Sequence, residues 1–182
     1  MPPSFMLTLY GNDEVFLEKY MQETPGYYTT GDAGYYDNDG YLNVMTRLDD
    51  IINTAGHRLS TAQMEEVLIG HPAVSEAAVV AKMEELKGEI PIGFVVLKAN
   101  QKIENIEKQL IQLIRHEIGP VASFQHVIIV ERLPKTRSGK ILRNILRKII
   151  EGEEYKFPAT IEDESALTIA HEKVKAYGKG LG

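Results

Sequence analysis

Two apolar segments, residues 74–82 and 90–98, most constrain what this chain can fold into. Short apolar runs of this kind are typical of buried β-strands. From residue 52 onward, the predicted order of elements is hairpin, helix, strand, strand, helix, strand, loop and helix. This order predicts a compact α+β unit in which helices cover a small sheet. The third strand of that sheet is expected at 124–131.

Two hairpins are predicted before the first of these apolar strands. They are formed by residues 34–36 with 41–45, and by residues 48–53 with 57–59, the second pair joined by a turn at 54–56. The first pair is joined by Asp37-Asn38-Asp39-Gly40, which is turn chemistry. A calcium loop would need glycine at the sixth position from Asp37, where Leu42 stands, so a plain hairpin turn is favoured.

Capping residues and apolar periodicity indicate the helices. Ser60 is a suitable N-cap, and Gln63 three residues later completes a capping box. The helix that follows ends before His71-Pro72. Further helices are expected at residues 12–22, 103–118 and 141–150, with a weaker one at 166–177 in a polar tail that begins at Glu151.

Composition excludes several classes of protein. The 182 residues carry a net charge of −6, which disfavours non-specific nucleic-acid binding. The chain has no cysteine, so disulfides, thiol catalysis and Cys-ligated metals are excluded. It has no apolar run long enough to span a membrane and no secretion-signal layout at its N-terminus. The five histidines lack the spacing of a helical metal site, so no metal ligand is predicted.

A basic loop at residues 133–143 stands out in this acidic chain. It holds four cations in nine residues, namely Lys135, Arg137, Lys140 and Arg143. Gly139 lets the backbone bend just before Lys140, which a loop can aim at an anionic group. A Walker-type phosphate loop is excluded, because Pro134 and Ile141 occupy the positions of its first glycine and its hydroxyl residue. Taken alone, the charges favour a solvated surface.

Three motifs, in order, resemble the C-terminal end of the acyl-adenylate-forming enzymes. They are Tyr28-Thr29-Thr30-Gly31-Asp32, the stretch 46–60 followed by Glu65-Glu66, and the basic loop. Gly56-His57-Arg58, Ile118-Gly119-Pro120 and the full loop are most similar to short-chain acyl-CoA synthetases that use acetate or propionate. Thr46 and Ala55 depart from the residues most common in the family, and neither carries a charged role.

The resemblance implies a domain organisation and a fold. Residues 1–48 would be the C-terminal remnant of a large N-terminal adenylation domain, so that the chain begins partway through a larger protein. Residues 49–150 would be the mobile C-terminal domain, a β-hairpin plus a three-stranded sheet flanked by helices. Residues 151–182 would be a polar tail. The phosphate loop and acid pocket of the large domain are absent, so this chain alone is expected to be inactive.

The resemblance also implies nucleotide-binding and hinge residues. Asp32 would hold the ribose hydroxyls, although a turn-capping role is open from the residues alone. Arg47 would contact ribose and phosphate oxygens. Arg58 would meet a nucleotide phosphate, since Arg suits planar, bidentate recognition. Asp49 would be the hinge about which the small domain swings, although Asp49-Asp50 is also consistent with an exposed acidic pair.

CoA binding and catalysis are implied at three further positions. Gly56 would let the backbone approach the pantetheine of CoA, a role compatible with a tight turn. Arg115 would lie near the CoA 3′-phosphate, although a solvated helix face fits it nearly as well. Lys140 would be the lysine of adenylation, stabilising charge that builds up as a carboxylate attacks the α-phosphorus of ATP.

The implied activity is an AMP-forming acetate- or propionate-CoA ligase that uses ATP, Mg²⁺ and CoA, none of them tightly bound by this fragment. Its partners would be the large N-terminal domain of the same protein and a lysine acetyltransferase or deacetylase acting on Lys140. Neither nucleic acid nor a membrane span is expected, and the compartment would be cytoplasmic or the mitochondrial matrix. The alternative is a stand-alone, non-catalytic binding or regulatory module that retains this fold.

Overall fold

The structure, a computed structural model, describes residues 4–99 and 103–178. The chain divides into two compact units, residues 1–49 and 50–182. The division falls beside Asp49, where the resemblance implies the hinge. The roles implied for the two parts stay predictions.

The first unit contains one helix and one hairpin. The helix is α1 (Asp13–Tyr20), and the hairpin pairs β1 (Asp32–Tyr36) with β2 (Leu42–Arg47). Asp37 organises the turn of this hairpin, because its Oδ1 accepts the N–H groups of Asp39 at 3.0 Å and Tyr41 at 2.9 Å. The hydrogen bond from the Tyr41 N–H is the main cause that lowers the pKa of the Asp37 carboxyl. The expected hairpin is therefore confirmed, and Asp37 stabilises its turn.

Residues 27–30, which precede β1, form no strand. The Thr29 N–H donates to the Tyr20 carbonyl at 2.8 Å, and the ring of Tyr28 stacks on that of Tyr20 at 5.2 Å. These contacts hold the segment against α1. The strand expected at 48–53 is shorter than predicted, because Leu48–Asp50 forms a 3₁₀ turn and β3 starts at Ile51.

The second unit is built on one five-stranded sheet. The long strand β6 (Gly88–Leu97) lies at its centre, pairing antiparallel with the edge strand β5 (Val74–Glu84) and parallel with β7 (His126–Ile129). The hairpin of β3 (Ile51–Thr54) and β4 (His57–Ser60) joins this sheet where Thr54 pairs with Gly88. The predicted α+β class is thus confirmed, with the hairpin belonging to the same sheet as the three core strands.

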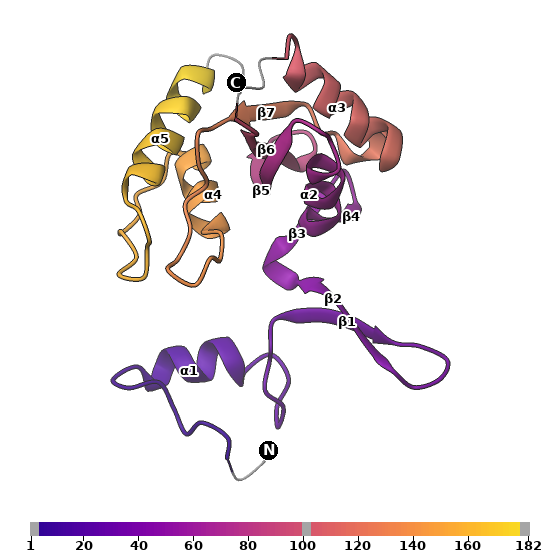
Figure 1. Cartoon of the computed structure of the whole chain (residues 1–182). Coiled ribbons are helices and arrows are strands. Elements are labelled where there is room, and N and C mark those ends of the chain that lie inside the picture. The colour runs from indigo at the N-terminus through magenta and orange to yellow at the C-terminus, as the bar shows by residue number, and fades with distance from the viewer. Residues whose placement is uncertain (1–3, 100–102, 179–182) are drawn as a thin grey trace. The chain divides into compact units, whose positions relative to one another are not determined.

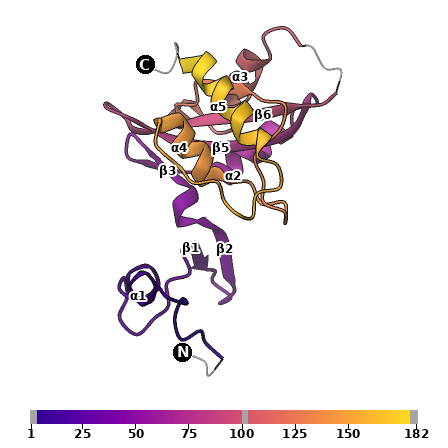
Figure 2. The same ribbon diagram turned by 90° about the vertical axis from the view of Figure 1, so that its left-hand side faces the viewer.

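Helices cover both faces of this sheet (Figure 1). They are α2 (Thr61–Ile69) and α3 (Ile106–Glu117) on one face, and α4 (Arg143–Glu151) and α5 (Ser165–Tyr177) on the other. Figure 2 shows the second pair in front of β5 and β6. Ser60 caps α2 as predicted, since its side chain accepts the Gln63 N–H at 3.4 Å.

Successive side chains of β6 point to opposite faces of the sheet. In β6, Ile92 and Phe94 pack with α4 and α5, whereas Val95 packs with α2 and α3. Gly93 leaves room for Phe124, because a Cβ at this position would lie 2.7 Å from the ring. Both faces of the strand are therefore buried, which is why it reads as an unbroken apolar run.

The segment after Glu151, expected as a polar tail, contributes to the core. Besides forming α5, it buries five apolar side chains in the cluster that also contains α4. They are Ile161, Ala166, Leu167, Ala170 and Val174. Among the described residues, no helix is both long and apolar enough to cross a membrane.

A buried carboxylate joins the layers. Glu65 of α2 is 7% exposed, and its Oε1 accepts the Val79 N–H of β5 at 2.8 Å. The Arg143 guanidinium at the start of α4 donates to both oxygens, at 2.8 Å and 2.6 Å. This hydrogen bond, with a smaller contribution from Asp50, raises the pKa of Arg143. One side chain thus connects a helix on each face with the strand between them.

Replacing Glu65 by alanine is expected to lower the free energy of unfolding by about 3 kcal/mol, because it leaves Arg143 and the Val79 N–H without their acceptor. Urea denaturation of the chain measures this loss. The neighbouring Glu66 is exposed, so Glu66→Ala provides a matched control that should change stability by less than about 0.5 kcal/mol. Equal effects of the two substitutions would contradict the role assigned to Glu65.

Candidate functional site

The basic loop folds into a closed turn immediately before α4 in the chain. The Thr136 N–H donates to the Lys140 carbonyl at 2.9 Å, and the Gly139 N–H donates to the Thr136 carbonyl at 2.8 Å. The Thr136 hydroxyl accepts the Lys140 N–H at 3.1 Å. Gly139 has a φ of +82°, a conformation that side chains with a Cβ disfavour. The backbone of Lys140 is therefore fixed on both its N–H and its carbonyl.

Two of the four cations in this loop have carboxylate partners. Lys135 lies 2.7 Å from Glu76 of β5, and Arg143 binds the buried Glu65. Arg137 and Lys140 are exposed, and no ion pair involving either occurs within the described residues. The local excess of positive charge is thus reduced to two solvent-facing groups, one of which is Lys140.

A second carboxylate ties α4 to the hairpin. Glu89 of β6 accepts the Asn53 N–H of β3 at 2.9 Å through Oε2, and its Oε1 lies 2.8 Å from Arg147 of α4. The sequence motifs include Glu65 but assign it no role, and they do not include Glu89. The available signal was Arg143 and Arg147, four residues apart on one helix face, which require acidic partners on the surface they cover.

Gly56 lies in a two-residue turn between β3 and β4. Ala55 and Gly56 have φ values of +47° and +84°, as a type I′ hairpin turn requires. The Ala55 N–H donates to the Lys87 carbonyl at 2.8 Å, which fixes the turn to the tip of the β5–β6 hairpin. A Cβ on Gly56 would meet no atom within 4 Å. The turn is therefore open to solvent, and only its backbone angle demands glycine.

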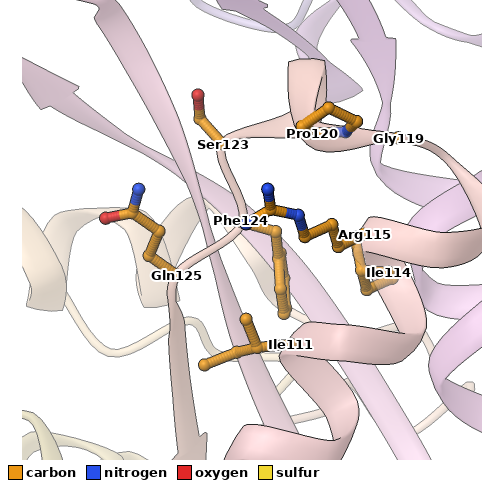
Figure 3. Close-up of a pocket in the computed structure, with 8 residues that line it drawn as sticks. All are labelled: Ile111, Ile114, Arg115, Gly119, Pro120, Ser123, Phe124 and Gln125. Carbon is orange, nitrogen blue, oxygen red and sulfur yellow. The ribbon is translucent and has the colours of Figure 1, made fainter.

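Arg58 and Arg115 are both exposed and lie on different elements. Arg58 is in β4, where it pairs with Asn53 of β3. Arg115 is in the last turn of α3 and lines a pocket of about 100 Å³ (Figure 3). The wall opposite α3 comes from Gly119, Pro120 and residues 123–125, and Ile111 and Phe124 give the pocket apolar surface. The arrangement offers one guanidinium beside a small, partly apolar hollow.

Asp32 and Arg47 lie together in the first unit. They are cross-strand partners at the end of the β1–β2 ladder, with Arg47 Nη1 3.8 Å from Asp32 Oδ1. Both side chains are well exposed, at 55% for Arg47 and 41% for Asp32. Thr30 supports the strand start by accepting the Asp32 N–H at 3.2 Å. The two residues therefore present a carboxylate and a guanidinium to solvent side by side.

The predicted hinge residue, Asp49, lies within the 3₁₀ turn Leu48–Asp50, and its side chain is outside the described residues. The predicted site residues thus fall into two groups. Asp32 and Arg47 belong to the first unit, and Gly56, Arg58, Arg115 and Lys140 belong to the second.

No group of three or more histidine, aspartate or glutamate side chains in the described part of the chain is placed to hold a metal ion. His126 of β7 is partly buried. Burial, followed by the charges of Lys82 and Lys87, lowers its pKa. Its ring lies edge-on to that of Tyr177, with centroids 6.0 Å apart, so it serves packing between β7 and α5.

Comparison with known families gives one clear match. Residues 63–140 match the family described as the AMP-binding enzyme C-terminal domain. The matched segment runs from α2 to Lys140 itself, so it contains both carboxylates that hold α4 but ends before α4 begins.

Relatives are found among curated acyl-CoA synthetases. The mitochondrial short-chain family member B of Dictyostelium discoideum is 55% identical over 91% of this chain and 24% of its own length. The human mitochondrial short-chain family member 3 is 44% identical, over 96% of this chain and 26% of its own. An acetyl-coenzyme A synthetase of Coprinopsis cinerea is 44% identical, over 94% and 27%. The chain therefore spans about a quarter of the length of these relatives.

Two solved structures superpose on most of this chain. The amide bond synthetase McbA from Marinactinospora thermotolerans superposes with a TM-score of 0.65 at 29% identity, covering 80% of this chain and 28% of that one. An ATP-bound RpMatB-BxBclM chimera superposes with a TM-score of 0.69 at 26% identity, covering 81% and 29%.

Replacing Gly56 by alanine is expected to lower the free energy of unfolding by about 1 kcal/mol, from the left-handed backbone alone. Urea denaturation of the chain measures this effect. Gly178 is the matched control, since it also has open space around it but a helical φ of −54°. Gly178→Ala should leave stability unchanged or slightly raised, and a loss equal to that of Gly56→Ala would refute the backbone explanation.

Proposed function

Because residues 63–140 form an AMP-binding enzyme C-terminal domain and the chain is homologous to short-chain acyl-CoA synthetases over most of its length, we propose that it supplies Lys140 and CoA contacts to such an enzyme. In the first half-reaction, a carboxylate oxygen attacks the α-phosphorus of ATP and pyrophosphate leaves, giving an acyl-adenylate. In the second, the thiol of CoA attacks the acyl carbon and AMP leaves. The product is the thioester.

Lys140 acts in the first half-reaction. Negative charge increases on the phosphate oxygens as the carboxylate attacks, and a positioned ammonium stabilises this transition state more than the ground state. The observation that carries this proposal is the charge pairing of the loop. Lys135 and Arg143 are held by carboxylates, whereas Lys140 projects from a closed turn and is exposed. An ammonium held in this way is available to an anionic ligand.

The nucleotide is bound by three further groups. Asp32 accepts hydrogen bonds from the two ribose hydroxyls, a pairing for which two carboxylate oxygens are well suited. Arg47, 3.8 Å from Asp32, contacts neighbouring ribose or phosphate oxygens. Arg58, exposed on β4, contacts a nucleotide phosphate during adenylation.

The second half-reaction uses the other side of the small domain. The open turn at Gly56 admits the pantetheine of CoA, and Arg115, beside its pocket, meets the 3′-phosphate. We assign the exchange between the two half-reactions to rotation about Asp49, which withdraws Lys140 and brings in the Gly56 turn. The division into compact units beside Asp49 supports this assignment. A hinge of this kind needs only a few residues that absorb the backbone change.

Acetate or propionate is the proposed acid, on the strength of relatives named as short-chain family members and as an acetyl-coenzyme A synthetase. Mg²⁺ would neutralise the phosphates of ATP. Relatives carry the word mitochondrial in their names, so the matrix is proposed as the compartment ahead of the cytoplasm. The alternative function is a non-catalytic module that keeps the fold.

Substituting Lys140 by alanine should separate the two half-reactions once the large N-terminal domain is supplied. Acid-dependent exchange of pyrophosphate into ATP is expected to fall by about 10²–10³-fold, the typical effect of removing one transition-state donor. Thioester formation from ready-made acyl-adenylate should be unchanged. Lys108→Ala, which removes an exposed cation from α3, is the control and should affect neither reaction. Equal losses in both assays would refute the assigned role, and no activity with the wild-type chain would favour the non-catalytic module.

Acetylation of Lys140 is expected to suppress adenylation, because it converts the charged ammonium into a neutral amide. Pyrophosphate exchange would be measured on protein acetylated at this position and again after deacetylation, which should restore the rate. If the acetylated form adenylates as fast as the unmodified one, the electrostatic explanation is wrong.

A further inference from the structure

Residues 158–162, here called the C-terminal strap, run beside the basic loop. The Arg137 N–H donates to the Thr160 carbonyl at 2.9 Å, and the Glu162 N–H donates to the Lys135 carbonyl at 2.9 Å. Thr136 and Ile161 form the antiparallel bridge between these two hydrogen bonds. The strap therefore binds the loop through its backbone, three to five residues before Lys140.

The strap itself is anchored in the core. Ile161 is 7% exposed and belongs to the apolar cluster under α4 and α5. The Ile161 N–H donates to the Pro158 carbonyl at 3.0 Å, which closes a turn at the start of the strap. At the other end, Asp163 forms an ion pair with Arg132 on the incoming side of the loop. The strap is thus held by the burial of Ile161 and, just after its C-terminal end, by the ion pair of Asp163 with Arg132.

A continuous chain of hydrogen bonds leads from the strap to Lys140. On one side Thr136 is bridged to Ile161, and on the other its N–H and hydroxyl bind the carbonyl and N–H of Lys140. Lys135 is bridged in turn to Ile141, immediately after Lys140. Residues 135 and 136 therefore lie between the strap and the backbone of Lys140, like a central strand between two neighbours.

We propose that the C-terminal strap is a positioning element for Lys140 in adenylation, an inference that rests on the proposed function. A lysine side chain has four rotatable bonds along its carbon chain. The position of its ammonium group is therefore well defined only if the backbone from which it projects is fixed. The family match ends at residue 140 and does not include the strap, which makes this role separate from the matched domain. Small displacements of a catalytic group reduce rates strongly, because the reacting geometry is narrow.

One variant pair tests the backbone hydrogen bonds. Glu162→Pro removes the N–H that binds Lys135, and is expected to slow adenylation on the order of tenfold while thioester formation from acyl-adenylate stays within about twofold. Glu164→Pro is the control, because its φ of −64° already suits proline and it immediately precedes the first turn of α5. It should leave both half-reactions unchanged. Both assays use the chain with its large N-terminal domain.

A second pair separates positioning from general stability. Ile161→Ala and Ile90→Ala remove the same atoms from the same apolar cluster, at residues that are 7% and 8% exposed. Only Ile161 lies in the strap, so only Ile161→Ala should lower the ratio of adenylation to thioester formation, on the order of tenfold. Ile161→Val should restore most of that ratio. Identical ratios for the two alanine variants would overturn the proposal, because the strap would then serve stability alone.

Hydrogen exchange of the 182-residue chain adds a measurement that is independent of activity. The Lys140 amide should exchange faster in Glu162→Pro than in the wild type or in Glu164→Pro, and unchanged exchange would count against the strap. Lys140→Ala, assayed beside these variants, identifies which inference fails. If it retains full adenylation, the proposed function falls and this inference falls with it. If it loses adenylation while both strap variants keep theirs, only the strap is refuted.

Discussion

The hydrogen-bonded pair of Glu65 and Arg143 is the contact on which the arrangement of the second unit depends. Glu65 reaches from α2 on one face of the sheet to α4 on the other, and its second interaction fixes it to the Val79 N–H between them. A buried carboxylate is tolerated only when such partners compensate for its lost hydration. The same pair therefore sets where α4 begins, and with it where the basic loop must end.

Glu89 makes a similar contact with Arg147, one helical turn after Arg143 on α4. By binding Arg147 and the Asn53 N–H, it connects α4 with the strand that leads to the Gly56 turn. Glu89 thus joins the helix that follows Lys140 to the hairpin carrying Gly56. Because these contacts are internal to the second unit, the lysine and the turn belong to one compact unit, and the proposed rotation at Asp49 would move both together. Exchange of one for the other then requires no internal rearrangement.

Local signals in the sequence predicted much of this fold. The Ser60 cap, the Asp37 turn and the apolar runs of β5 and β6 each depend on residues close together in the chain, and each was found in the structure. The partners of Arg143 and Arg147 lie 78 and 58 residues away, so no periodicity indicates them. The strap was missed for another reason. It binds through backbone groups that every residue possesses, and Pro158 to Glu162 have no regular pattern.

The position of the strap and α5 at the end of the described chain has a consequence for synthesis. Their side chains complete the cluster that covers the outer face of β6, so this face stays exposed while the ribosome is still adding residues 150–178. The apolar cluster packed against α2 and α3 consists of residues that come earlier in the chain, so this cluster can form first. Folding during synthesis would therefore proceed one side of the sheet at a time, and the nascent polypeptide would need protection from aggregation until α5 emerges.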